Sequence, residues 1–203
     1  HKTALVIGML FTWFLTACVV VLILAMPNLL VGAFGFERAD AFKMQSAAIV
    51  MQMLGCILAG LLADRFGAGK VILFGSLAVA IIAGIFYNSL GHVAPSTVFM
   101  LYMLLGLFSG TVGMVSYSMV KMFPAQIRFS GISFSYNVAY AIAGGITLPL
   151  VQWLSLYSNI GAMYYIWVVC LVSFFTAMLY RVKFEKQDLA ASAISTPHNT
   201  VKD

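Results

Sequence analysis

Two apolar runs flank a short charged turn in residues 44–90, which read MQSAAIVMQMLGCILAGLLA, DRFGAGK and VILFGSLAVAIIAGIFYNSL in succession. Each run holds about 20 residues, the length that an α-helix needs to cross a hydrocarbon core of about 30 Å. Neither run alternates apolar and polar residues as the strands of a membrane barrel do. Because backbone N–H and C=O groups in lipid need partners within the chain, both runs are predicted to be transmembrane helices.

The rest of the chain repeats this succession of apolar runs and polar turns. Hydrophobic residues make up 63% of the 203 residues and charged residues 8%, which excludes a soluble domain with a polar surface. We expect an all-α integral membrane protein in which residues 1–182 form a bundle of six transmembrane helices, over residues 4–34, 44–63, 71–90, 97–120, 129–153 and 160–180. Residues 183–203 are polar and are expected to form a mobile cytoplasmic tail.

The orientation of the bundle follows from its basic residues, because short cytoplasmic loops retain Lys and Arg. Six spans place both termini on one side. That side carries nine basic residues: Lys2, Arg65, Lys70, Lys121, Arg128, Arg181, Lys183, Lys186 and Lys202. The other side carries only Arg38 and Lys43, so both termini are expected to be cytoplasmic. This asymmetry explains the net charge of +5, and no nucleic-acid partner is inferred from it.

Residues that could carry catalysis or hold a metal are scattered. The three cysteines lie inside predicted spans, and the three histidines lie far apart in loops or at the termini. No nucleophile, base and metal ligands come together, and the loops are too short to build an active site. We therefore expect no enzyme, no cofactor and no metal site. The chain has no initiator Met and opens just before a span, so it is interpreted as part of a longer protein.

The charged turn between the second and third predicted spans carries a specific pattern, GLLADRFGAGK over residues 60–70. Glycines allow close packing or a tight turn, and a carboxylate at a helix end can face another helix N-terminus. The pattern resembles the G-x-x-x-D-R-x-G-x-x-K loop between the second and third helices of each half of the major facilitator superfamily. The residues that carry the resemblance are Gly60, Asp64, Arg65, Gly67 and Lys70. The alternative is an ordinary cytoplasmic loop that follows only the positive-inside rule.

A second pattern, FPAQIRFSGIS over residues 123–133, precedes the fifth predicted span and is followed by a Tyr-Asn pair. Through Pro124, Arg128 and Gly131 it resembles the F-P-x-x-[IV]-R-[FY]-[ST]-G pattern of the metabolite:proton symporter branch of that superfamily. The sequence departs from the branch in residues 146–149, where Ile-Thr-Leu-Pro replaces an expected Thr-Pro pair.

The resemblance implies the carboxy-terminal half, helices 7 to 12, of a twelve-helix carrier in a bacterial inner membrane. Such carriers have two six-helix halves around a central solute cavity, and each half consists of two three-helix units. The implied partners are the missing amino-terminal half, the lipid bilayer and a small solute. A half without its counterpart is expected to self-associate. All six acidic residues lie outside the predicted spans, so a proton-coupling carboxylate is expected in the missing half.

Candidates for solute contact are neutral polar and aromatic residues at helical spacing. In the fifth span Ser133, Asn137 and Tyr140 follow one another by three or four residues and so share a helix face. The same face is expected to continue through Ser130, Gly144 and Thr147. Tyr117 in the fourth span and Gln52 in the second are further candidates. The alternative role for these residues is hydrogen bonding between helices.

Three functional classes remain open from the sequence. Half of a carrier accounts for the spans and both patterns, and it would act in proton-coupled symport of a small polar metabolite such as an osmolyte, an amino-acid derivative or an organic acid. A uniporter, which needs no titratable group in the membrane, is the first alternative. A six-helix channel or membrane scaffold is the second, and it would be favoured if no amino-terminal half existed.

Overall fold

The computed structural model describes residues 2–158 and 160–185, and every regular element in these ranges is a helix. Six helical segments are long and apolar enough to cross a membrane: Lys2–Leu24, Arg38–Phe66, Ala68–Ser89, Pro95–Met122, Arg128–Tyr157 and Gly161–Glu185. The expected all-α fold with six membrane-spanning helices is confirmed. Most of the expected tail, residues 186–203, lies outside the described residues.

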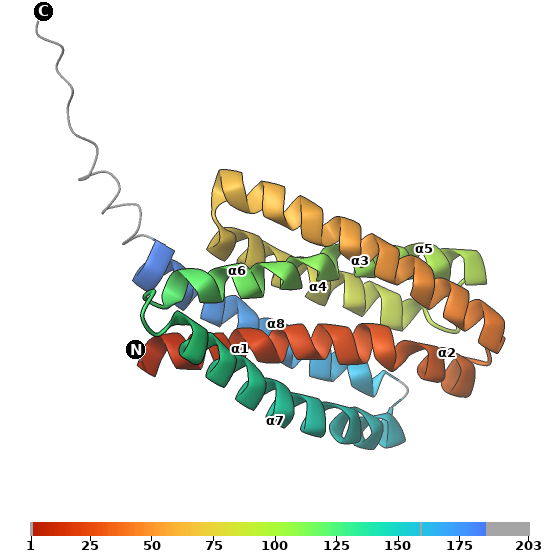
Figure 1. Ribbon diagram of the computed structural model, residues 1–203. Helices are drawn as coiled ribbons and strands as arrows, with labels where there is room; N and C mark the ends of the chain where they lie inside the picture. Colours follow the sequence, from red (N-terminus) through yellow and green to blue (C-terminus); the bar gives the residue numbers. More distant parts are fainter. Residues whose placement is uncertain (1, 159, 186–203) are drawn as a thin grey trace, which may run out of the picture.

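Several spans are built from more than one helical piece (Figure 1). The first consists of α1 (Lys2–Ala17) and a π-helix, η1 (Cys18–Leu24), and it is followed by α2 (Met26–Phe34). The fourth consists of α5 (Pro95–Ser109), a 3-10 turn, η2 (Gly110–Val112), and α6 (Gly113–Met122). The others are α3 (Arg38–Phe66), α4 (Ala68–Ser89), α7 (Arg128–Tyr157) and α8 (Gly161–Tyr180), which runs into a second π-helix, η3 (Arg181–Glu185).

Several helices are longer than the predicted spans, most clearly α3, which begins at Arg38 and not at residue 44, and two further differences concern the first and last spans. The first predicted span, residues 4–34, is not one continuous helix: the backbone bends at Ala25, next to the Met26–Pro27 step. The bend arises there because proline has no N–H to donate within a helix. At the other end of the chain, helical backbone continues beyond residue 180 to Glu185 and so includes the first three residues of the expected tail.

The bundle consists of two three-helix units that pack in equivalent ways. The first unit contains α1, α3 and α4, and the second contains α5 with α6, α7 and α8. α3 of the first unit packs along α5 of the second, and α7 of the second packs along α1 of the first (Figure 1). α4 and α8, the last helices of the two units, pack against each other. This exchange of equivalent helices is the pattern that an internal structural repeat produces.

Small residues bring the backbones of α3 and α5 into contact. A Cβ atom added to Gly106 would collide with the carbonyl oxygen of Ala48. A Cβ atom added to Gly110, at the start of η2, would collide with the backbone of Gly55. Helices in lipid depend on such close approach, because no hydrophobic effect drives them together. The contact therefore joins the first unit directly to the second.

Burial is uneven across the six spans. Only 17% of the most apolar window of α3 and 22% of that of α7 is buried, against 50–67% for the other four spans. Large apolar side chains are exposed along α3, including those of Ile49, Met53, Ile57 and Leu61. Within the part of the chain that the structure describes, α3 and α7 therefore present broad faces that lack packing partners.

Candidate solute-binding face

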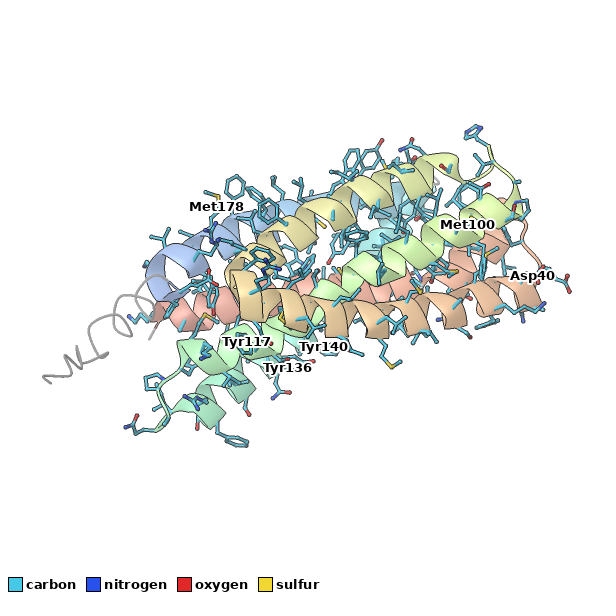
Figure 2. All side chains as sticks on the ribbon, turned by 90° about the horizontal axis from the view of Figure 1, so that it is seen from above. Asp40, Met100, Tyr117, Tyr136, Tyr140 and Met178 are labelled. Atoms are coloured by element: carbon cyan, nitrogen blue, oxygen red, sulfur yellow. The ribbon has the colours of Figure 1, made fainter. Side chains whose placement is uncertain are left out.

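Exposed aromatic side chains lie on α6 and on α7. Tyr136 and Tyr140 stack on α7 with ring centroids 5.8 Å apart. On α6, the Lys121 ammonium lies over the ring of Tyr117, 5.8 Å from its centroid. Figure 2 shows the three tyrosines in the half of the bundle away from Asp40. Tyr117 and Tyr140 are 44% and 39% exposed, so both rings remain accessible to a solute.

Asn137 lies on the exposed side of α7, one turn from Tyr140. Its side-chain nitrogen donates to the carbonyl oxygen of Ser133 at 2.8 Å. Its amide oxygen and the Ser133 hydroxyl have no hydrogen-bond partner within residues 2–158 and 160–185. An amide oxygen accepts and a hydroxyl can donate or accept, so this part of α7 can bind a polar solute group of either kind.

Two glutamines of α3 that share a helix face have different environments. Gln45 Nε2 donates to the carbonyl oxygen of Ile23 in η1 at 2.9 Å, so this side chain joins two helices. Gln52 Nε2, two turns further along α3, is buried and has no partner among the described residues. Leaving a buried donor unsatisfied costs about 1–3 kcal/mol. Gln52 is therefore a candidate to donate a hydrogen bond to a solute.

Thr147 belongs to the core and not to the exposed face of α7, contrary to the sequence prediction. It is fully buried, and its hydroxyl oxygen lies 2.7 Å from the hydroxyl oxygen of Tyr165 on α8. The indole N–H of Trp13 on α1 donates to the same Tyr165 oxygen at 2.8 Å. The buried residues of α7 recur every fourth position, which turns the buried stripe by about 40° at each step. This rotation carries Thr147 inward while Tyr140 stays exposed.

The turn between α3 and α4 is held by a residue from the far end of the chain. Glu185 Oε1 accepts a hydrogen bond from the Gly69 N–H at 3.1 Å, and its Oε2 lies 3.6 Å from the Arg181 guanidinium. Gly67 has a φ of +89°, a conformation that favours glycine. A carboxylate at the first turn of a helix is stabilised by the free N–H groups there. Glu185 thus takes the helix-terminus position that the sequence suggested for Asp64.

Asp64 faces a hollow of about 510 Å³ at the same end of the bundle, which Arg65, Lys70, Tyr117 and Lys121 also line. Asp64 is exposed and forms no ion pair within the described ranges. Gly60 was expected to permit close backbone approach, but an added Cβ atom would meet only the Met114 methyl carbon at 4.0 Å. The exposure of Asp64 leaves its carboxylate available to a partner outside the described chain.

The second sequence pattern closes the turn between α6 and α7. Arg128 Nε donates to the carbonyl oxygen of Phe123 at 3.1 Å, and the Ile127 N–H donates to that of Pro124 at 3.1 Å. A Cβ atom on Gly131 would lie 2.6 Å from the Phe123 ring, so the ring occupies the place of a side chain. Pro124, Arg128 and Gly131 therefore shape this turn, which sets the start of α7 and with it the position of the exposed tyrosines.

Several known transporters are similar in sequence to most of this chain, although no family model matches it. The chain is 30% identical over 131 residues to the inner membrane metabolite transport protein YhjE of Escherichia coli. It is 33% identical over 141 residues to the proline/betaine transporter and 33% identical over 125 residues to the α-ketoglutarate permease of the same organism. These matches cover 64%, 64% and 59% of the chain. The relatives are transporters, in agreement with the expectation that the chain is not an enzyme.

The fold matches that of a solved transporter, the major facilitator superfamily proton:xylose symporter XylE, with a TM-score of 0.60 over 89% of this chain. The chain thus has the fold of a six-helix half of a major facilitator superfamily transporter, and the resemblance to that superfamily is confirmed. Sequence identity to XylE is 16%, so that comparison concerns the fold alone. The chain spans 43% of XylE and between 27% and 30% of the three relatives, which corresponds to one six-helix half of the superfamily fold.

Sequence reasoning missed one hollow of this six-helix bundle that contains polar side chains. A hollow of about 370 Å³ between α2 and α7 is lined by Asn28, Tyr87, Gln152 and Ser155. Tyr87 on α4 is 1% exposed, and its hydroxyl has no hydrogen-bond partner in the described part of the chain. These residues come from different helices and do not repeat along any one of them. The proline beside Asn28 was the only signal that the sequence offered here.

Proposed function

We propose that the chain forms the carboxy-terminal half, helices 7 to 12, of a secondary transporter that works by alternating access. The observation that carries this proposal is the low burial of α3 and α7. These two helices hold Gln52, Asn137 and Tyr140, the polar and aromatic candidates described above. An amino-terminal half packed against α3 and α7 would enclose the exposed Asn137 and Tyr140 between two walls, as in carriers built from paired repeats.

The proposed solute is a small polar or zwitterionic metabolite. The amides of Gln52 and Asn137 can hydrogen-bond a carboxylate, and the exposed face of Tyr140 can receive a quaternary ammonium group. Relatives named for proline, betaine and α-ketoglutarate fit this chemistry, because all three solutes carry carboxylates. An osmolyte, an amino-acid derivative or an organic acid is therefore proposed.

Proton coupling is proposed to reside in the amino-terminal half. Coupling requires a group in the membrane that alternates between a charged and a neutral form. The side chains that the described half offers to the solute, Gln52, Asn137, Tyr117 and Tyr140, carry no carboxylate. A facilitator without proton coupling is the second candidate. Because these side chains are neutral, they fit a facilitator as well as they fit a symporter whose coupling group lies in the other half. The basic residues, nine against two, support cytoplasmic termini, and the relative YhjE supports a bacterial inner membrane.

The proposal is tested with the complete gene product in proteoliposomes. We expect six further spans upstream and accumulation of labelled proline, betaine or α-ketoglutarate when an inward proton gradient is imposed. Collapse of the gradient by a protonophore should abolish accumulation. Equilibration without accumulation would assign the facilitator instead. An upstream frame without membrane spans, together with no movement of any of the three solutes, would overturn the carrier assignment.

Substitution of the exposed candidates on α7 should weaken solute binding. In the complete carrier, Asn137→Ala and Tyr140→Ala are each expected to raise the KM of uptake roughly 5- to 30-fold, because each removes an interaction of about 1–2 kcal/mol. Tyr157→Ala, at the far end of the same helix and 75% exposed, is the matched control and should leave KM unchanged. A lower thermal stability with an unchanged KM would instead assign Asn137 and Tyr140 to helix packing.

A further inference from the structure

The break after η1 leaves two backbone carbonyls without a donor from residue 27. In an α-helix the N–H of residue 27 would donate to Ile23, and in a π-helix it would donate to Leu22. Residue 27 is proline, so neither bond can form. The register before the break is that of a π-helix, since the Ala25 N–H donates to the Val20 carbonyl oxygen at 2.9 Å.

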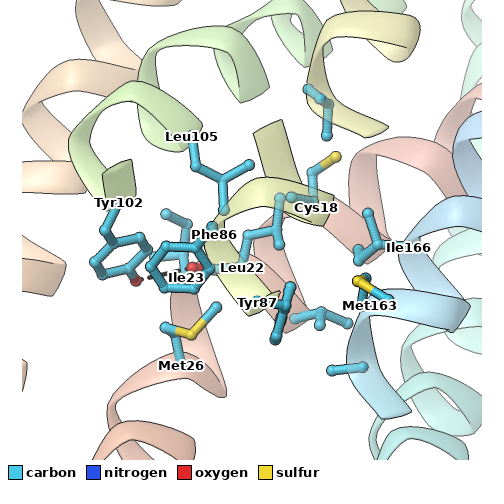
Figure 3. Close-up of a cluster of buried hydrophobic side chains, with 14 of the residues drawn as sticks. Cys18, Leu22, Ile23, Met26, Phe86, Tyr87, Tyr102, Leu105, Met163 and Ile166 are labelled. Carbon is cyan, nitrogen blue, oxygen red and sulfur yellow. Dashed lines mark hydrogen bonds between the residues drawn. The ribbon is translucent and has the colours of Figure 1, made fainter. Parts of the chain in front are cut away.

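Side chains from two other helices satisfy both carbonyls. Gln45 Nε2 on α3 donates to the Ile23 oxygen at 2.9 Å, and the Tyr102 hydroxyl on α5 donates to the Leu22 oxygen at 2.8 Å. Tyr102 is fully buried, and its ring lies 5.5 Å from that of Phe86. Figure 3 shows Tyr102 in one cluster with Leu22 and Ile23. A carbonyl without a partner is costly inside a membrane protein, so both bonds stabilise the bent form.

We propose that Gln45 and Tyr102 are positioning residues that hold the hinge at Pro27 and thereby fix α2. α2 contributes Asn28 to the hollow of about 370 Å³ against α7, so the angle of the hinge determines the shape of that hollow. When α2 swings away, the Ile23 and Leu22 carbonyls exchange Gln45 and Tyr102 for water. The inference rests on the proposed carrier function, because it places the hollow on the path of a solute.

The hinge is tested in the purified complete carrier by the rate at which maleimide modifies a cysteine introduced by Val21→Cys. Val21 is 1% exposed and lines the hollow. The parent protein carries Cys18→Ala, Cys56→Ala and Cys170→Ala. Gln45→Leu and Tyr102→Phe are each expected to raise the modification rate roughly 5- to 30-fold, because each leaves one buried carbonyl unsatisfied in the bent form. Ser46→Ala, which removes a hydroxyl bonded only within α3, should leave the rate unchanged.

Rescue distinguishes a hinge from a general loss of stability. Pro27→Ala returns an N–H to residue 27, so it should bring the rate of Gln45→Leu or of Tyr102→Phe back to within about twofold of the parent. Loss of packing would not be repaired in this way. The proposal is overturned if both single variants label like the parent, or if Pro27→Ala rescues neither. The labelling measurement needs no solute or proton gradient. The expected rates for the single variants and for their combinations with Pro27→Ala can therefore be observed even if the protein transports none of the proposed solutes, so failure of the proposed function and failure of the hinge are distinguishable.

Discussion

Proteoliposomes that contain only this chain are expected to accumulate no solute, whereas the complete carrier accumulates it in the same lipid. The chain supplies one wall of the proposed cavity, and the face of α7 that holds Asn137 lacks packing partners within the described residues. A solute bound there would stay open to solvent on one side, so alternating access could not occur. Uptake over time, with and without an imposed proton gradient, gives the measurement.

The control for this result is correct folding of the isolated chain. Its helical content by circular dichroism should match that of a six-helix bundle, and chemical crosslinking should show association through the exposed apolar face of α3. Proton-driven accumulation by the chain alone would contradict both the proposed division of the carrier into two halves and the location of the coupling group.

Asp64→Asn in the complete carrier is expected to lower the maximal rate of uptake at least tenfold. Asp64 ends α3 beside a hollow lined by basic and aromatic side chains, and it forms no ion pair within the described part of the chain. We expect its carboxylate to contact the opposite half in one of the transport conformations. A hydrogen bond to a charged group contributes about 1.5–3 kcal/mol, and 1.4 kcal/mol corresponds to a factor of ten.

Asp40→Asn is the matched control, because Asp40 lies near the other end of the same helix. Its carboxylate pairs with Lys43 at 2.9 Å, and both side chains are more than half exposed. Exposed pairs of this kind contribute little to stability, so uptake should stay near that of the parent protein. Membrane levels of both variants are compared by immunoblot. Normal uptake by Asp64→Asn at normal membrane level would remove the proposed role of the loop.

The helical architecture could be predicted from sequence because hydrophobic length alone counts membrane spans. Runs of about 20 apolar residues leave a chain in lipid few alternatives to the helix. The interruption of the first span could not be predicted in the same way. Pro27 indicated a bend, but the donors to the Ile23 and Leu22 carbonyls come from Gln45 and Tyr102, which are distant in sequence.

The candidate site was predictable where a single helix determines exposure and not where several helices meet. Asn137 and Tyr140 share an exposed face of α7, and their spacing predicted the shared face. Thr147 fits the same spacing, yet the contact with Tyr165 on another helix places it in the core. Glu185 gave no signal, because its partner at the start of α4 is more than one hundred residues away in sequence. Periodicity describes one helix, and these roles depend on its neighbours.

The glycine contact between α3 and α5 also has a mechanical consequence. Sliding of α5 along α3 would bring the side chains next to Gly106 and Gly110 against the α3 backbone, and the two helices come from different three-helix units. The six-helix half should therefore turn as one stiff body, with little internal shear between its units. During a conformational cycle, bending would then be confined to segments outside this contact. The short helix α2, beyond Pro27, is one of these segments.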